Sequence, residues 1–174
     1  MTTATHKKNQ NGKAPVAKTA ECASSADRAA QSPERAKLID GLNHDLAGEY
    51  QAIVMYTHYS AKLTGPYRRE LRALFQAEIS DEQGHAQFLA DKIASLGGEP
   101  TTEPRAVPPA NQPREMLEQV LAAEKTAIAD YDERILQAAA FDDIGLKVSL
   151  ENQIADETRH KEEIERILDG WRER

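Results

Sequence analysis

The chain has 174 residues, of which 40% are hydrophobic and 29% are charged, and its net charge is −7. This length and composition fit one globular domain with a core of its own, and the abundance of Ala, Leu, Glu, Lys and Arg favours helices. Cys22 is the only cysteine, which excludes an intrachain disulfide, and no apolar run has the length that a signal peptide or a membrane span requires. We therefore expect a cytoplasmic protein.

Residues 1–31 differ in composition from the rest of the chain. They are rich in Thr, Lys, Ala, Ser and Asn and have hardly any large apolar side chain, which predicts a disordered basic tail. Residues 1–33 carry five cations and two anions, a net charge of +3, so the remainder carries −10. A net charge of +3 over this length would attract DNA only weakly, so a solvated tail is favoured over DNA binding through the tail. The acidic body suits cation uptake.

Residues 32–174 are expected to form a single helical domain. Ser32 and Pro33 are typical of a helix start, and Gly97 and Gly98 of a helix end. Four prolines lie within residues 99–112, and this density excludes a helix and favours an extended crossover. Periodic apolar residues predict helices at about 33–63, 66–96, 113–140 and 144–169.

The connections between these helices predict an all-α four-helix bundle. The short first and third connections require antiparallel neighbours. The crossover has about 14 residues, which at ~3.1 Å each reach about 43 Å, the length of a thirty-residue helix. The second and third helices can therefore run parallel, and the bundle has one long connection.

Two short stretches, residues 81–85 and 156–160, share the pattern Asp-Glu-x-x-His. Residues i and i+3 lie on one face of a helix, so the Glu and the His of each copy point the same way. A lone Glu-x-x-His is a weak signal, because charged helices often contain it by chance. Two copies in one chain are a stronger signal.

Each copy is preceded by another inward glutamate at a matching distance. The interval from Glu49 to Glu82 equals the interval from Glu124 to Glu157. A single offset superposes the two halves of the domain, with Glu49 on Glu124 and Glu82 on Glu157, which predicts two copies of one hairpin around a pseudo-twofold axis. Four glutamates and two histidines in this order are the ligand set of a di-metal site in a four-helix bundle. The predicted ligands are Glu49, Glu82, His85, Glu124, Glu157 and His160.

Four carboxylates that converge in a bundle core require cations, because their burial without them is costly. No lysine or arginine lies in the four predicted inward stripes, whereas two divalent metals would balance the four charges. Mixed oxygen and nitrogen ligands suit iron or manganese, and the absence of thiolates argues against structural zinc.

The repeat predicts a geometry for this centre. Glu49 and His85 would bind one metal, Glu124 and His160 the other, and Glu82 and Glu157 would bridge them. Four further residues are candidates for contact with these ligands: Asp81 beside His160, Asp156 beside His85, and Tyr56 and Tyr131 beside a ligand carboxylate. For the tyrosines, simple core packing is an equal interpretation. Glu78 is a candidate for an extra carboxylate near the centre or for part of an ion route. Its partner in the repeat is Gln153, so the absence of any such role is an equal interpretation.

Residues 38–170 resemble the ferritin-like superfamily, and the bacterioferritins most closely. The resemblance rests on the six predicted ligands, their spacings, Tyr56, and the stretches 42–53 and 96–100. It implies a ferritin-like four-helix bundle and a ferroxidase, in which two ferrous ions bind and O2 or peroxide oxidises them before the ferric iron enters a mineral core.

Two departures from the family pattern modify this expectation. Bacterioferritins carry a haem-ligating methionine directly after the second glutamate, and this chain has Gln83 there, so no haem is predicted. The chain ends at Arg174 without the fifth helix of large ferritin cages. A homo-oligomeric twelve-subunit cage, as in Dps-like proteins, is therefore favoured over a 24-subunit cage or a dimer.

Other functions use the same ligands. The alternative enzyme class is a di-iron or di-manganese oxidase without iron storage, such as a rubrerythrin-like peroxidase, a manganese catalase or a hydroxylase. An apolar access channel to the metals would favour the hydroxylase. A third hypothesis is a bundle without enzymatic activity that shields DNA through its tail.

Overall fold

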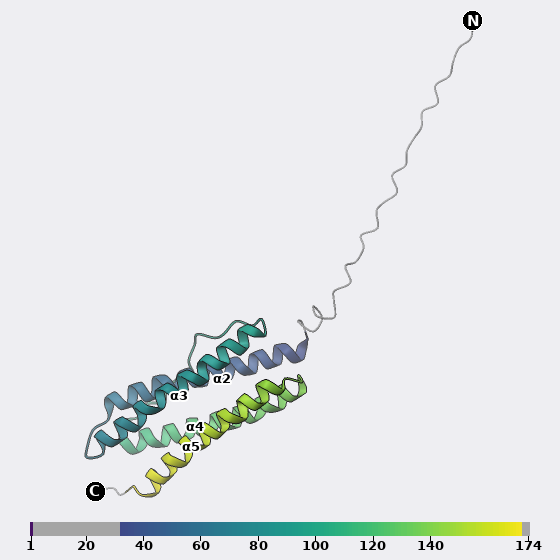
Figure 1. Ribbon diagram of the computed structural model, residues 1–174. Coiled ribbons are helices and arrows are strands. Elements are labelled where there is room, and N and C mark those ends of the chain that lie inside the picture. The colour runs from purple at the N-terminus through teal and green to yellow at the C-terminus, as the bar shows by residue number, and fades with distance from the viewer. Residues whose placement is uncertain (2–31, 172–174) are drawn as a thin grey trace.

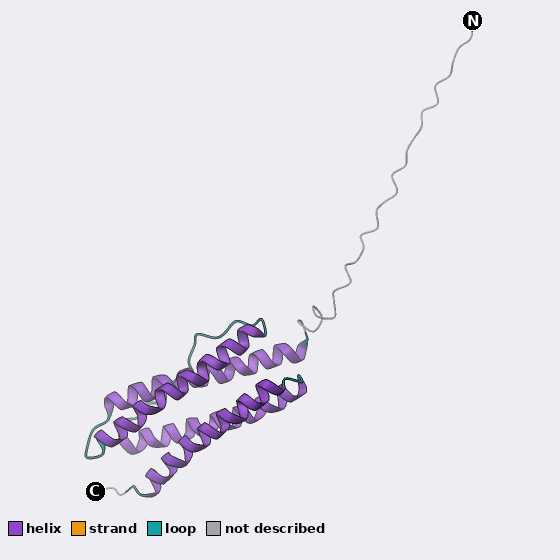
Figure 2. Cartoon of the chain, viewed as in Figure 1, coloured by secondary structure: helices purple, strands orange, loops and turns teal. Residues whose placement is uncertain are grey.

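The computed structural model describes Met1 and residues 32–171, which form four α-helices and contain no strand (Figures 1 and 2). The helices are α2 (Pro33–Lys62), α3 (Arg68–Ser95), α4 (Pro113–Ala140) and α5 (Ile144–Asp169). The prediction of an all-α four-helix bundle is confirmed. The predicted tail of residues 1–31 lies, except for Met1, outside the described residues. No described helix has the length and the apolar character needed to cross a membrane.

Local sequence signals set most of the helix ends. At the start of α2, the Ser32 side chain accepts a hydrogen bond from the Arg35 amide at 3.2 Å. At the start of α4, Glu115 completes a capping box. Both side chains give a hydrogen-bond partner to backbone amides that have none within the helix. Helix α3 begins two residues later than expected. Gly65 has a φ of +82° and starts a turn that continues to Tyr67, so the chain cannot enter the helix at Pro66.

The helices form two antiparallel hairpins, α2–α3 and α4–α5, which pack together through α2 and α4 (Figure 1). The long crossover contains no helix, as predicted, and it runs along α2. Its backbone is held there at Asn43, which accepts from the Thr101 amide at 2.7 Å, and at Tyr59, whose hydroxyl donates to Pro108 O at 2.6 Å. Helices α3 and α4 therefore run parallel.

The interior consists of two apolar clusters with a polar layer between them. One cluster contains Leu46 of α2 and Leu89 of α3, and the other contains Met55 of α2 and Phe75 of α3. The buried glutamates and histidines lie between these clusters on all four helices. The apolar clusters therefore bury the acidic centre and keep its helices in place.

A second buried polar group was not predicted. Arg134 of α4 forms two hydrogen bonds with Asp45 of α2, at 2.8 and 3.2 Å, and both side chains are buried. Arg134 passes Gly41 so closely that a Cβ there would lie 1.9 Å from its guanidinium. The predicted inward-facing stripes do not include this pair, because Arg134 lies beside the stripe of α4, which contains Ile135.

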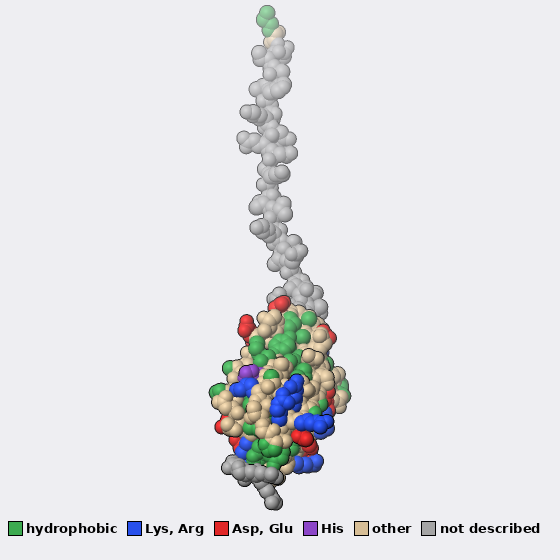
Figure 3. Space-filling view, turned by 90° about the vertical axis from the view of Figure 1, so that its left-hand side faces the viewer, with side chains coloured by type: hydrophobic (Ala, Val, Ile, Leu, Met, Phe, Trp, Pro, Cys, Tyr) green, Lys and Arg blue, Asp and Glu red, His purple; other side chains and the backbone are tan. Residues whose placement is uncertain are grey.

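The surface is mixed in charge. Figure 3 looks onto the end of the bundle where α3 begins, and several Lys and Arg side chains lie on that end. Arg68 and Arg69 are among the exposed residues of this segment.

Candidate metal centre

The six predicted ligands lie together in the middle of the bundle, and all of them are buried. They form two overlapping groups whose nitrogen and oxygen atoms lie within 4.8 Å of one another. One group contains Glu49, Glu82, His85 and Glu157, and the other contains Glu82, Glu124, Glu157 and His160. Glu82 and Glu157 belong to both groups, which is the arrangement that two bridging carboxylates require. The role of these residues as metal ligands stays a prediction.

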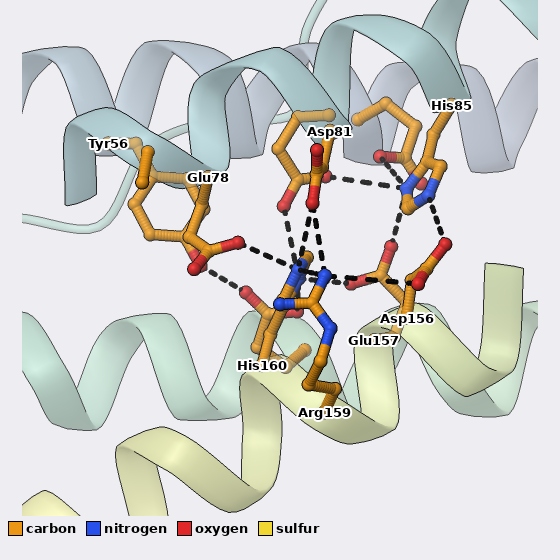
Figure 4. Close-up of polar contacts among 12 residues, drawn as sticks. Tyr56, Glu78, Asp81, His85, Asp156, Glu157, Arg159 and His160 are labelled. Carbon is orange, nitrogen blue, oxygen red and sulfur yellow. Dashed lines mark hydrogen bonds and ion pairs between the residues drawn. The ribbon is translucent and has the colours of Figure 1, made fainter. Parts of the chain in front are cut away.

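Each histidine presents its Nδ1 atom to the carboxylates. The Nδ1 of His85 lies 2.8 Å from Glu157 Oε1 and 3.7 Å from Glu49 Oε2. The Nδ1 of His160 lies 3.5 Å from Glu157 Oε2 and 3.7 Å from Glu124 Oε2. Both imidazoles therefore point the same ring nitrogen at the centre (Figure 4).

The inward atoms of the centre are incompletely satisfied by the protein. Buried polar atoms normally have hydrogen-bond partners. Within the part of the chain that the structure describes, five inward atoms have no hydrogen-bond partner, and the close contact between His85 and Glu157 lacks hydrogen-bond geometry. These atoms are Glu49 Oε2, Glu82 Oε1, His85 Nδ1, Glu157 Oε1 and His160 Nδ1. Carboxylate oxygens and imidazole nitrogens that converge in this way are suited to divalent iron or manganese.

Without metal, protons must compensate the charges. Burial raises the pKa of Glu82 well above its usual value, and the charges of Glu157 and Glu49 raise it further. Burial lowers the pKa of His85, but its contacts with Glu157 and Glu49 outweigh burial and raise the pKa to about 10. The metal-free centre therefore holds protons that incoming cations must displace.

The two halves of the centre differ in their protonation. Burial raises the pKa of Glu124 to about 8 although His160 opposes this. Burial also lowers the pKa of His160, but contacts with Glu124 and Glu157 outweigh it and raise the pKa to about 12. Burial raises the pKa of Glu157, but its contacts with His160 and His85 outweigh burial and lower the pKa. Glu157 is therefore the carboxylate that stays ionised between two imidazolium ions.

Two buried tyrosines join the hairpins across the centre. The Tyr56 hydroxyl donates to Glu124 Oε1 at 2.5 Å, and the Tyr131 hydroxyl donates to Glu49 Oε1. Burial raises the pKa of both tyrosines well above the usual value, so both remain donors. Each tyrosine therefore orients a glutamate of the opposite hairpin. Residue spacing along one helix does not reveal such a contact between hairpins.

The predicted aspartates lie near the outer ring nitrogens, at longer distances. Asp156 Oδ2 is 3.6 Å from His85 Nε2, and Asp81 Oδ2 is 3.7 Å from His160 Nε2. Glu78 is the closer partner of His160, with its Oε2 at 2.7 Å from Nε2. Of the interpretations of Glu78, the structure therefore favours an extra carboxylate at the centre.

Arg159 lies on the outer side of the centre between the two aspartates (Figure 4). Its Nη2 donates to Asp81 Oδ2 at 3.0 Å and lies 3.8 Å from Asp156 Oδ1. The same atom is 3.0 Å from His160 Nε2. Sequence analysis did not single out this arginine, because its position beside His160 on α5 does not by itself show what lies opposite on α3.

A small cavity adjoins the glutamates on the other side, between α2 and α4. Its volume of about 20 Å3 holds about one water molecule. Small side chains form much of its wall, namely Gly48, Ala52, Ala123 and Ala127, and Arg105 of the crossover lines it as well. Arg105 is held there by Asp130, whose Oδ2 accepts from it at 2.7 Å.

Comparison with known proteins places the chain in a family. The family model described as a ferritin-like domain matches residues 39–173. The chain therefore belongs to the ferritin-like family.

Individual relatives include both bacterioferritins and a less specifically named protein. A ferritin-like, diiron-carboxylate protein from Bacillus anthracis is 51% identical, with a TM-score of 0.78 over 79% of this chain and 99% of that one. A bacterioferritin structure from Desulfovibrio desulfuricans, described as showing the diiron site in different catalytic states, is 29% identical, with a TM-score of 0.73 over 78% and 80% of the two chains. A Rhodobacter capsulatus bacterioferritin with a metal-free dinuclear site and haem iron is 29% identical, with a TM-score of 0.70 over 77% and 84%.

A curated bacterioferritin from Desulfovibrio desulfuricans is 39% identical over 69 residues. This match covers 40% of the present chain and 38% of that relative. The chain is thus bacterioferritin-like and carries a candidate di-iron site of buried glutamates and histidines.

Proposed function

We propose that this protein is a ferroxidase that oxidises Fe(II) with O2 or peroxide at a site within one chain, and that it stores and detoxifies the iron. The observation that carries the proposal is the pair of overlapping buried ligand groups, which share Glu82 and Glu157. Two ferrous ions per chain are the substrate, and manganese fits the same donor atoms. The six predicted ligands hold the ions, with Tyr56 and Tyr131 orienting two of the carboxylates.

The chemistry requires two one-electron donors at one place. Two Fe(II) ions give two electrons to one O2, which with two protons becomes H2O2. Two Fe(II) ions likewise reduce one H2O2 with two protons to two water molecules. Holding both ions between Glu82 and Glu157 places them together, so the oxidant meets both electrons in one encounter.

The cavity between α2 and α4 supports a small oxidant. Its volume of about 20 Å3 suits a molecule of the size of water, whereas a hydroxylase requires space for an organic substrate. The cavity therefore favours ferrous ions over an organic molecule as the species that is oxidised. A di-iron or di-manganese peroxidase without storage uses the same small oxidant and is the alternative that experiment must exclude.

Storage requires a closed assembly, and we propose a homo-oligomeric cage with twelve subunits, in the cytoplasm, without haem. Exposed apolar side chains supply surface for contacts between subunits. Ile144 and Val148, one turn apart on α5, are 71% and 50% exposed. The basic tail plays no required part in this proposal.

The decisive experiment is an anaerobic titration with Fe(II), followed by addition of O2 or H2O2, with the mass of the particle measured by light scattering. Two irons per chain, fast oxidation and a large particle that then takes up many more ferric ions are the expected results. A dimer that binds two metals but never mineralises would establish the alternative. Failure to bind two ions per chain would overturn both.

A further inference from the structure

We infer that the two metal positions are not equivalent, and that Glu78 makes the position at His160 bind its ion more tightly and fill first. This inference rests on the proposed function and adds an order of filling to it. It concerns a positioning residue, because Glu78 contacts the imidazole of His160 and not the metal.

The two halves of the centre otherwise match closely. Each position has a histidine with Nδ1 facing inward, two shared glutamates, and a glutamate that a tyrosine of the opposite hairpin orients. Each outer Nε2 has an aspartate at 3.6 or 3.7 Å. A difference between the positions must therefore come from residues that break the repeat.

Residue 78 breaks the repeat. Glu78 Oε2 lies 2.7 Å from His160 Nε2, and its side chain is 13% exposed. Its counterpart in the repeat is Gln153 on α5, which is buried and whose amide oxygen has no hydrogen-bond partner. Among the described residues, the outer nitrogen of His85 thus has only Asp156 nearby, at 3.6 Å and with a half-exposed side chain.

The effect follows from the chemistry of imidazole. When Nδ1 binds a cation, the ring's remaining proton is on Nε2, so Nε2 becomes a donor. A carboxylate that accepts this proton fixes the tautomer and the ring orientation and raises the basicity of the ligand nitrogen. Glu78 does this for His160 from a largely buried position, whereas Asp156 faces His85 from solvent, where its charge is screened.

Arg159 does not replace Glu78 as the partner of His160. Its guanidinium donates a hydrogen bond to Asp81 at 3.0 Å and lies 3.8 Å from Asp156, and its charge also interacts with Glu78. Arg159 also approaches His160 Nε2 at 3.0 Å, but a guanidinium only donates and cannot serve a protonated Nε2. Glu78 is therefore the acceptor that remains for His160.

The test is an anaerobic titration of the full chain with Co2+, whose visible absorption reports its coordination, and with Zn2+ by calorimetry. Wild type should show two classes of one ion each. Glu78→Gln should weaken the first class by about tenfold to 100-fold and bring the two classes together. Glu70→Gln, an exposed glutamate earlier on α3, is the matched control and should change neither class.

Two single-histidine variants serve as backgrounds that show which metal position Glu78 affects. His85→Ala retains the position at His160, and His160→Ala retains the position at His85. Glu78→Gln should weaken binding in the first background and change it by less than about twofold in the second, as expected for a local ligand partner. Gln153→Glu should tighten binding in the second background, and circular dichroism checks that each variant is folded.

The outcomes separate this inference from the proposed function. Two ions per chain with equal affinities, or equal weakening by Glu78→Gln in both backgrounds, would overturn the inequivalence and leave the ferroxidase intact. Fewer than two ions bound by wild type would instead contradict the proposed function. A Glu78→Gln effect confined to the His85→Ala background is the expected result.

Discussion

The bundle contains two buried clusters of charged side chains, one between α2 and α4 and one on all four helices. They compensate the energetic cost of burying charge in different ways. Asp45 and Arg134 neutralise each other through two hydrogen bonds, and the pair needs nothing from solvent. The centre of four glutamates and two histidines leaves five inward atoms without partners. A cluster that is complete within the chain is structural, whereas one that is incomplete is suited to bind cations.

The complete cluster is not free of cost. Burial raises the pKa of Asp45 to about 7, although the hydrogen bond and charge of Arg134 oppose this. Desolvation of the carboxyl group therefore outweighs the attraction that its partner supplies, as is common for buried ion pairs. The pair holds α2 and α4 in register beside the centre and does not take part in it.

The largest expected effect comes from removing a shared carboxylate of the incomplete cluster. Glu82→Ala or Glu157→Ala should lower the rate of Fe(II) oxidation to that of protein-free solution, because both ions lose a ligand. The metal-free Glu82→Ala bundle should remain folded with equal or greater stability, since one buried carboxyl group is gone, whereas Glu157→Ala should lose stability because His85 and His160 lose their shared anionic partner. Stopped-flow absorbance and thermal unfolding measure the two effects. Asp132→Ala, an exposed aspartate of α4, is the control, and retained fast oxidation in the Glu82 and Glu157 variants would contradict the proposed site.

Breaking the complete cluster should damage stability and not activity. Arg134→Met leaves Asp45 buried without its partner and should cost about 3–5 kcal/mol in unfolding free energy. The double variant Asp45→Leu with Arg134→Met should recover most of this loss. Urea unfolding of the metal-free protein measures the unfolding free energy of both variants. A double variant as unstable as the single one would show that the two side chains stabilise the fold by more than balancing each other's charge.

The sign of the pH dependence gives a further check on this pair. The folded pKa of Asp45, about 7, lies above its usual value of 3.8, so the folded state keeps a proton that the unfolded state has lost. Stability from this group is therefore present at low pH and is lost as pH rises through about 7. The cost of Arg134→Met should accordingly grow from about pH 5 to about pH 8.

The tyrosines connect the incomplete cluster to the opposite hairpin, and their removal should have an intermediate effect. Tyr56→Phe and Tyr131→Phe should each weaken Zn2+ binding by about tenfold, because the glutamate that each one orients becomes free to rotate. Tyr59→Phe is the matched control, since its hydroxyl donates to Pro108 O, away from the centre. Equal effects of all three substitutions would indicate a general loss of packing.

The last check is the pH dependence of metal binding, which needs no substitution. In the metal-free centre the pKa values of His85, His160 and Glu124 are about 10, 12 and 8, so at neutral pH these groups hold protons that metal displaces. Affinity for Zn2+ should therefore rise with pH, by about tenfold per pH unit for each proton released. Calorimetry in two buffers of different ionisation enthalpy counts these protons, and an affinity independent of pH would contradict the assignment.

Much of the fold could be predicted from local signals. Apolar periodicity, the Ser32 cap and the proline-rich crossover predicted all four helices to within two residues and the topology, since these signals act within a few residues. The start of α3 was misplaced by two residues, because the conformation of Gly65 determines where the turn ends. The six residues of the centre were foreseen because their spacing in the first hairpin recurs in the second.

Contacts between helices could not be read from a periodic pattern. The insertion of Arg134 past Gly41 to Asp45 depends on the distance between α2 and α4. The choice of Glu78 over Asp81 as the nearer partner of His160 depends on how α3 and α5 are rotated against each other.

The sequence by itself determined that four glutamates and two histidines face inward and that the carboxylates exceed the cations in their stripes, because helix geometry and charge are local properties. Only the tertiary structure decided that each tyrosine orients a glutamate of the other hairpin, that the cavity holds about one water molecule, and that the two histidines have unlike partners. These features depend on distances of a few ångströms between separate helices, which packing of the whole bundle sets.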